Sequence, residues 1–111
     1  MYDNTKFGEK PMIQNYKAMG VDMVRVPYDL REISPGIYSW REISVKYNNF
    51  NYGGLVSALI GLHYTQAEMT AVINNYLLDP EDEATKAEFI AMQECRKEAK
   101  EIANRILNDN Q

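Results

Sequence analysis

Residues 21–47, VDMVRVPYDLREISPGIYSWREISVKY, place two strand-like runs on either side of a tight turn. Val21–Tyr28 is rich in β-branched and aromatic residues, which favours a strand. In Ser34-Pro35-Gly36, proline presets the first central position of a turn and glycine accepts a positive φ at the second. Residues 37–47 then supply a second strand. The stretch therefore predicts a β-hairpin.

Two details of this hairpin are expected to disturb its ladder. Pro27 has no N–H to donate, so its strand should lie at a sheet edge or end there. The alternation of Tyr38 and Trp40 is out of phase with that of the apolar residues after Arg41. A bulge near Arg41-Glu42 would reconcile the two registers.

The segment before the hairpin is less regular. Residues 1–10 are polar and are expected to form a loose N-terminal arm or an edge segment. Residues 11–19 begin with proline, carry apolar residues at three- and four-residue spacing and are followed by Gly20, which predicts a short helix. The competing interpretation of residues 11–19 is a strand-like arm.

The segment after the hairpin changes to helical patterns. Residues 48–54, NNFNYGG, form a loop by composition. Leu55–Leu62 is apolar and fits either a buried helix or a buried strand. Thr65-Gln66-Ala67-Glu68 matches a capping box, in which the Thr hydroxyl and the Glu carboxylate each accept from a backbone amide of the first turn. A helix is expected to follow it.

The last predicted helix runs from about Pro80 to about Leu107, with Asp79 as its N-cap and Pro80 at its first position. Its apolar residues form a narrow stripe like the seam of a helical pair. Either the hairpin or the same helix of a second subunit would cover this stripe, and a homodimer is the expected oligomer. The predicted seam consists of Phe89, Met92, Cys95, Ala99, Ile102 and Ile106.

The length and composition fit one globular domain. The chain has 111 residues, of which 45% are hydrophobic and 25% charged, and a chain of this size holds one core. We therefore expect a single domain across residues 1–111. Its fold class is α+β: an N-terminal β-hairpin or small antiparallel sheet packed on two or three helices, with a long C-terminal helix.

The net charge and the single cysteine limit the kinds of partner and the cellular compartment that we expect. The net charge of −4 argues against binding to a nucleic-acid polymer, which needs clustered Lys and Arg. Cys95 is the only cysteine, so no intramolecular disulfide can form, which suits a reducing compartment. No apolar run resembles a secretory signal or reaches the ~20 residues that span a bilayer. The expected location is the cytoplasm, without a membrane partner.

No constellation of residues predicts catalysis. His63 is the only histidine, and no nucleophile or acid stands at a characteristic spacing from it. The acids at 79–83 are explained by a helix start, and no glycine-rich phosphate loop is present. We therefore expect no enzyme, no metal site and no cofactor.

Aromatic and basic side chains are the remaining candidates for a binding surface. Twelve aromatic residues are many for this length, and they either fill the core around the hairpin or bind a ligand or partner. The aromatic candidates are Tyr38, Trp40, Tyr47, Phe50 and Tyr52. The basic candidates are Arg96, Lys100 and Arg105, interleaved with glutamates. They predict a solvated face or, alternatively, a nucleotide-like anion pocket at a subunit interface, joined by Arg25 or Arg41.

Two segments, 24–27 (VRVP) and 34–42 (SPGIYSWRE), resemble the short β segment of small bacteriophage and prophage proteins. Some of those proteins are tail-region or tail-fibre-assembly-like. In them a G-x-Tyr-x-Trp-x-Glu-like strand precedes helical segments, to which residues 92–100 (MQECRKEAK) would correspond here. The resemblance covers about half of the chain and implies a non-enzymatic accessory protein in the cytosol of a host cell.

Three functions are therefore weighed. The first is protein–protein interaction or assembly, with another protein or a second copy of the chain as partner. The second is binding of a small anionic ligand such as a nucleotide signal, which in a phage would counter a host defence. The third is an enzyme, ranked last because no catalytic set is visible.

Overall fold

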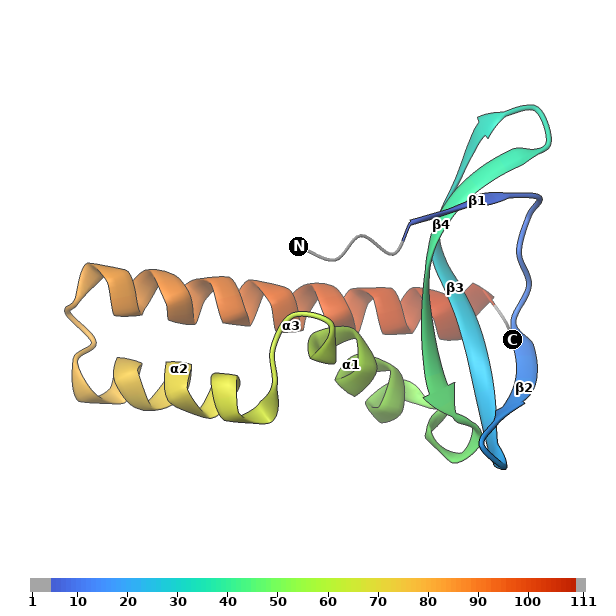
Figure 1. The fold of residues 1–111 in the computed structure, drawn as a ribbon. Helices are drawn as coiled ribbons and strands as arrows, with labels where there is room; N and C mark the ends of the chain where they lie inside the picture. Colours follow the sequence, from blue (N-terminus) through green and yellow to red (C-terminus); the bar gives the residue numbers. More distant parts are fainter. Residues whose placement is uncertain (1–4, 110–111) are drawn as a thin grey trace. The chain divides into compact units, whose positions relative to one another are not determined.

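The computed structural model describes residues 5–109, and within this range it has four β-strands and three α-helices. The chain divides after Gly54 into two compact units, a sheet unit and a helical unit, and each is described on its own. The α+β class is confirmed, as is the long C-terminal helix (Figure 1). The single domain stays a prediction.

The sheet unit is one antiparallel sheet with the strand order β1-β4-β3-β2 (Figure 1). The strands are β1 (Lys6–Gly8), β2 (Gln14–Ala18), β3 (Val21–Ser34) and β4 (Ile37–Lys46). β3 and β4 are the predicted hairpin, and Gly36 in its turn has a φ of 79°, so this prediction is confirmed. Lys6–Gly8, expected in a loose arm or an edge segment, forms the edge strand β1.

The β3–β4 register sets which side chains are buried. Val24 lies opposite Val45, and Val26 lies opposite Ile43. These four side chains and Tyr28 are buried, and because side chains alternate along a strand they share one face of the sheet. Burying an aliphatic side chain of this size is worth about 1.5–3 kcal/mol, so this apolar face stabilises the register.

Pro27 lies in the middle of β3, and the expectation that its strand would end there or be an edge strand is wrong. β3 is an inner strand that continues to Ser34. The ladder of β2 on β3, however, ends at the pair Gln14–Arg25. Since alternate residues direct their backbone groups to opposite neighbours, the missing N–H of Pro27 faces the β2 side just where β2 has ended. The strand tolerates proline for that reason.

A bulge does interrupt the hairpin, but it lies on β3 and not at Arg41-Glu42 on β4. Tyr28 pairs with Arg41 and Arg31 pairs with Ser39, so two β3 residues face one β4 residue. Asp29, the first of the two, has a φ of 54°, a left-handed conformation that Asp tolerates better than most residues. A second register shift follows between Glu32 and Ser34.

The helix predicted over residues 11–19 is wrong, and the competing strand is correct. Gln14–Ala18 forms β2, joined to β3 by the two-residue turn Met19-Gly20. Both turn residues have positive φ, 50° and 79°, as in the type I′ turn whose twist matches that of a hairpin. A helix of nine residues is marginal by itself, whereas the strand gains a ladder with β3.

The connection between β4 and the first helix is tighter than a loop. Tyr47–Asn49 forms a 3-10 turn, and helix α1 (Tyr52–Gly61) begins within the stretch predicted to be a loop. The Asn51 side chain accepts a hydrogen bond from the Gly54 amide at 2.8 Å. A Cβ on Gly54 would overlap the backbone carbonyl of Asn49, so this close approach requires glycine.

Of the two interpretations of Leu55–Leu62, the helix is correct: the segment lies almost entirely in α1, with Leu55, Leu59 and Ile60 buried. Helix α2 (Gln66–Leu78) begins with the predicted capping box, which is confirmed. The Glu68 amide donates to Thr65 Oγ1, and the Thr65 amide donates to the Glu68 carboxylate, both at 3.0 Å.

Helix α3 (Glu83–Asp109) starts later than predicted and is capped by Asp82, not by Asp79. The Asp82 carboxylate accepts from the Thr85 amide at 2.9 Å, and this hydrogen bond lowers the pKa of Asp82. Asp79 instead ends α2, and its carbonyl accepts from the Asp82 amide across the turn at Pro80. Two acids can each cap a neighbouring helix, and the sequence does not say which one does.

The first prediction concerns the close approach at Gly54. Replacing Gly54 with Ala should lower the free energy of unfolding by about 1–3 kcal/mol, because Cβ and the Asn49 carbonyl cannot occupy the same space. Urea denaturation followed by circular dichroism measures this. Gly53→Ala is the matched control: its Cβ would meet only the Asn51 side chain at 3.7 Å, so it should be neutral or stabilising. Equal effects of the two substitutions would contradict the prediction.

The second prediction concerns the Met19-Gly20 turn. The Met19 side chain is fully exposed, and its backbone has a positive φ that is costly for methionine. Met19→Asn should therefore raise the free energy of unfolding by about 0.5–1 kcal/mol, since Asn adopts this conformation readily. The shift of the urea midpoint tests it. Ala18→Asn, at an exposed position without positive φ, should give no gain.

Candidate functional site

Beyond the bulge, the β3–β4 hairpin continues as a two-stranded ribbon, residues 29–41, here called the arm (Figure 1). β1 lies along one edge of the arm, with Phe7 opposite Ser39. Four large apolar side chains of the arm and β1 are between 37% and 68% exposed. They are Phe7, Leu30, Ile33 and Ile37, and together they are called the apolar arm surface.

The polar side chains of the arm are, in contrast, largely paired with one another. Arg41 Nη1 lies 3.9 Å from Asp29 Oδ2 at the base of the arm. The Glu32 carboxylate accepts a hydrogen bond from the Tyr38 phenol opposite it, and this bond and its negative charge raise the pKa of Tyr38. These polar side chains of the arm therefore meet one another across the strands, while Leu30, Ile33 and Ile37 are exposed.

Trp40 anchors β1 to the arm. Tyr38 and Trp40 alternate on β4 on one face of the sheet, and both are half-buried. A Cβ at Gly8 would lie 3.5 Å from the Trp40 ring, so the indole covers the bare backbone of the edge strand. Within the described residues the buried Trp40 Nε1 has no hydrogen-bond partner. An unsatisfied donor of this kind costs stability, so packing must compensate for it.

Arg25, a candidate for gripping an anion, already has partners on the same face of the sheet. Its guanidinium stacks on Tyr16 at 4.5 Å from the ring centroid. Its Nε lies 3.6 Å from the Glu42 carboxylate, and its Nη1 donates to the Gln14 side chain at 3.4 Å. Like Arg41, which pairs with Asp29, it is charge-compensated within the sheet.

The other aromatic candidates do not gather at one place on the sheet unit. Tyr47 is exposed at the start of the 3-10 turn. Phe50 is half-buried just after that turn, and Tyr52 is exposed at the first position of α1. The alternation of β4 puts Tyr47 on the face of Val45, opposite to that of Tyr38 and Trp40. The five predicted aromatics therefore do not form one surface.

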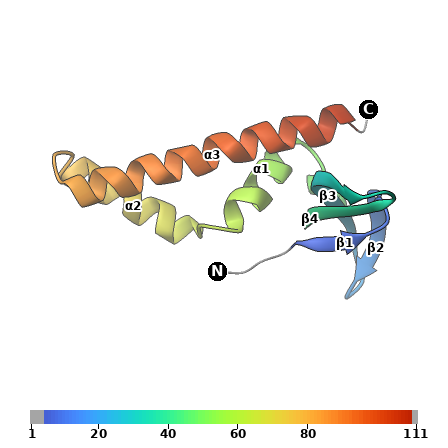
Figure 2. The same ribbon diagram turned by 90° about the horizontal axis from the view of Figure 1, so that it is seen from above.

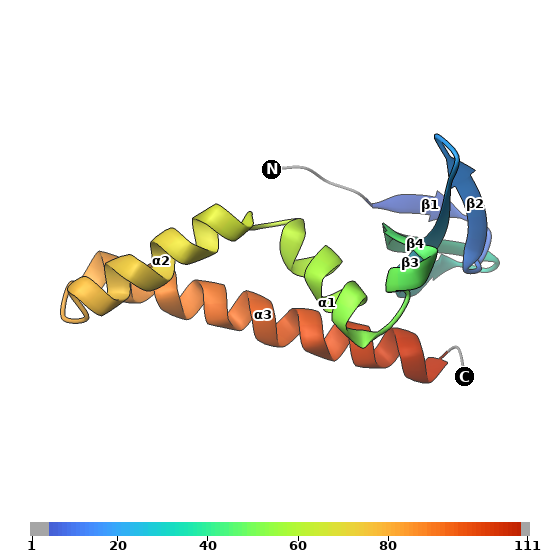
Figure 3. The same ribbon diagram turned by 90° about the horizontal axis from the view of Figure 1, so that it is seen from below.

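In the helical unit, α1 and α2 both lie along α3, α2 beside its first half and α1 beside its second half (Figures 2 and 3). Four of the predicted seam residues are buried in a single copy of the chain: Met92, Ala99, Ile102 and Ile106. Phe89 stacks on Tyr76 of α2 with ring centroids 4.2 Å apart, and Cys95 is half-buried. Most of the predicted seam is thus buried within one chain, and its contact with a second copy stays a prediction.

The three basic candidates on α3 do not converge. Successive residues of a helix turn by 100°, so Arg105, nine residues after Arg96, points to the opposite side of α3. Arg96 Nη1 donates to the Gln93 side chain at 3.4 Å, while Lys100 and Arg105 are exposed. One helix cannot bring these side chains around one small anion.

The chemistry-bearing residues elsewhere are dispersed. His63 lies exposed in the turn after α1. In the part of the chain that the structure describes, no three His, Cys, Asp or Glu side chains are placed to hold a metal ion. Over residues 5–109, none of the helices combines the length and apolar composition that crossing a bilayer requires.

The sequence pattern does not predict the apolar arm surface. Without a bulge, alternation along β3 would place Leu30 on the buried face with Val26 and Tyr28. The bulge at Asp29 changes this alternation, so Leu30 leaves the buried row. The one available signal was Asp29 itself, because aspartate tolerates a left-handed backbone. Comparison with known proteins adds no relative: no protein-family model, curated protein or solved structure matches the chain.

The third prediction concerns the thiol of Cys95. Burial, reinforced by the negative charge of Glu98, raises the pKa of this thiol. Since the thiolate is the reactive form, iodoacetamide should alkylate Cys95 several-fold more slowly in the folded chain than in urea, as measured by mass spectrometry. Glu98→Gln should speed the reaction of the folded chain. A folded rate equal to the unfolded rate would contradict the assignment.

Proposed function

We propose that the protein acts by protein–protein contact and that the apolar arm surface joins two copies of the chain. The observation that carries the proposal is the contrast within the arm. Its polar side chains are largely paired with one another, while Phe7, Leu30, Ile33 and Ile37 remain exposed.

The energetic argument rests on apolar burial. Complete burial of a Leu, Ile or Phe side chain is worth about 1.5–3 kcal/mol. Because the four side chains of the apolar arm surface are partly exposed, burying them against a partner would still release part of this free energy. Exposed apolar side chains scattered singly need no explanation, but Phe7 lies opposite Ser39 and therefore shares one face of the arm with Ile37. Two exposed apolar side chains at neighbouring positions of one face are a candidate interaction surface.

The charges of the arm favour a second copy as the partner. Asp29, Glu32, Arg31 and Arg41 sum to zero, so two arms can face each other without net repulsion. Across a twofold axis the same patch must be self-complementary, and mixed charges beside apolar groups meet that requirement.

This role is of the same kind as the accessory role implied by the resemblance to phage assembly proteins. The sequestering of a nucleotide-like anion has less support. Arg25 and Arg41 are charge-compensated, and the basic residues of α3 point to different sides of the helix.

The fourth prediction tests the proposal by light scattering over a range of concentrations. The wild-type chain should be dimeric, and Ile33→Lys/Ile37→Lys should be monomeric with an unchanged circular dichroism spectrum. Placing lysine in the interface should raise the dissociation constant at least about tenfold. Leu78→Lys, at an apolar position on α2 that is more exposed than Ile33 or Ile37, is the control and should remain dimeric.

Two outcomes would overturn the proposal. One is a wild-type chain that stays monomeric at the highest concentration reached. The other is a dimer that survives in Ile33→Lys/Ile37→Lys, which would place the interface elsewhere on the molecule.

A further inference from the structure

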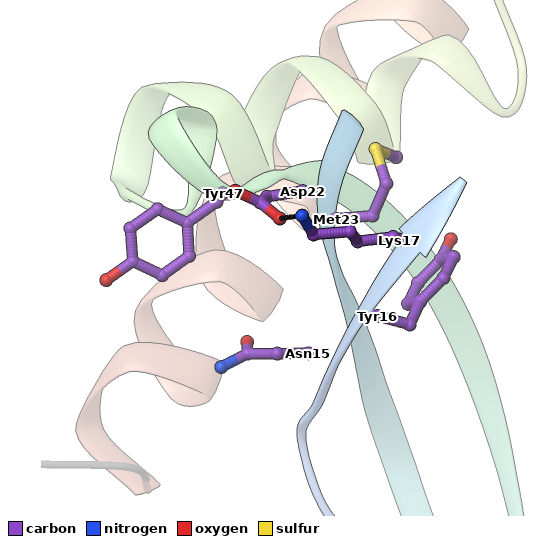
Figure 4. A pocket seen from close by; sticks show the side chains of 6 residues that line it. All are labelled: Asn15, Tyr16, Lys17, Asp22, Met23 and Tyr47. Atoms are coloured by element: carbon purple, nitrogen blue, oxygen red, sulfur yellow. Dashed lines mark ion pairs between the residues drawn. The ribbon is translucent and has the colours of Figure 1, made fainter. Parts of the chain in front are cut away.

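A cavity of about 330 Å³ opens at the end of the β2–β3 hairpin (Figure 4). This volume lies at the lower end of the range of small-molecule sites. Its lining residues are Asn15, Tyr16, Lys17, Asp22, Met23 and Tyr47. All six belong to the sheet unit, and all except Tyr47 lie in the paired strands β2 and β3.

The strand register gathers the polar lining residues on one face. Lys17 lies directly opposite Asp22, and Asn15, two residues before Lys17, shares their face. In Figure 4 the Tyr47 ring lies to the left of the Lys17–Asp22 pair and is directed away from it, the Asn15 amide lies below the pair, and Tyr16 lies on the other side of its strand. The cavity thus presents one ammonium, one carboxylate, one amide and one aromatic ring.

The ion pair in this cavity is loose. Lys17 Nζ lies 3.8 Å from Asp22 Oδ1, and the two side chains are 75% and 68% exposed. Exposed pairs of this kind contribute little to stability, so separating them costs little. Each charge can therefore turn to an opposite charge on a ligand.

The pairing of charges selects the ligand class. A simple anion would be attracted by the Lys17 ammonium but repelled by the Asp22 carboxylate. A simple cation would be attracted by Asp22 but repelled by Lys17. A zwitterion satisfies both charges at once, with its carboxylate on Lys17 and its ammonium on Asp22. The Asn15 amide can donate to the same carboxylate, and the Tyr47 ring offers a surface for an apolar group.

We propose that this cavity binds a small zwitterion of the α-amino-acid type, with an apolar or aromatic side chain packed against Tyr47. The site is separate from the apolar arm surface, and the proposal does not depend on self-association. No covalent step is involved: the ligand replaces one weak ion pair by two.

The fifth prediction is tested by titrating the isotope-labelled full chain and following its backbone amide signals by NMR. L-Phenylalanine should give saturable shifts centred on residues 15–23 and Tyr47. Two matched probes each lack one charge: N-acetyl-L-phenylalanine has no ammonium, and L-phenylalaninamide has no carboxylate. Both should bind at least about tenfold more weakly. Equal shifts with all three probes, or none with L-phenylalanine up to its solubility limit, would overturn the proposal.

Variants sharpen the test. Lys17→Gln and Asp22→Asn should each weaken binding of L-phenylalanine at least about tenfold, whereas Lys10→Gln, outside the cavity, should leave it unchanged. The exchanged pair Lys17→Asp/Asp22→Lys should retain measurable but weaker binding, because a zwitterion can reverse its charges but an L-amino acid then shifts its side chain relative to Tyr47. Since both side chains are largely exposed, these variants should fold normally, which circular dichroism verifies.

Two results with the variants would refute the site. One is unweakened binding by Lys17→Gln or Asp22→Asn, and the other is loss of binding in a folded exchanged pair. The arm variant Ile33→Lys/Ile37→Lys should bind L-phenylalanine like the wild type. Failure of the ligand site and failure of the arm interface are therefore separately visible.

Discussion

The antiparallel pairing of β3 with β4 is the constraint on which the sheet unit depends. Because Val24 faces Val45 and Val26 faces Ile43, the register buries one row of apolar side chains, and a slip by one residue would expose it. β1 then pairs with β4, and β2 pairs with β3, each through a ladder of its own. The faces on which Arg25 and Trp40 lie follow from this pairing, and those of Asn15 and Lys17 follow from the β2–β3 ladder.

The bulge at Asp29 divides the hairpin into two parts with different physical roles. Before it, alternation places β-branched and aromatic side chains on the buried face. After it, Leu30 no longer follows the buried row of Val26 and Tyr28, and Ile33 and Ile37 near the tip of the arm are exposed. A single residue with a left-handed backbone thus separates a part whose apolar side chains are buried from a part whose apolar side chains are exposed.

Local signals predicted the elements that depend on local chemistry. The Pro35-Gly36 turn and the Thr65 capping box were readable because the residue types themselves make the interactions. Residues 11–19 were predicted as a helix because their apolar spacing fits one, while the ladder that makes them a strand depends on β3, which lies outside this segment. Asp79 and Asp82 are equivalent as caps in sequence and are distinguished only by geometry. The candidate surface was least predictable, because aromatic content does not reveal that a bulge exposes Leu30.

The position of the single tryptophan has a practical consequence. Trp40 lies where β1 meets β4, with its indole shielded by the edge strand. Its fluorescence therefore reports on the sheet unit, whereas far-ultraviolet ellipticity is dominated by the three helices. Recording both signals during one unfolding experiment would show whether the two units melt together or one after the other.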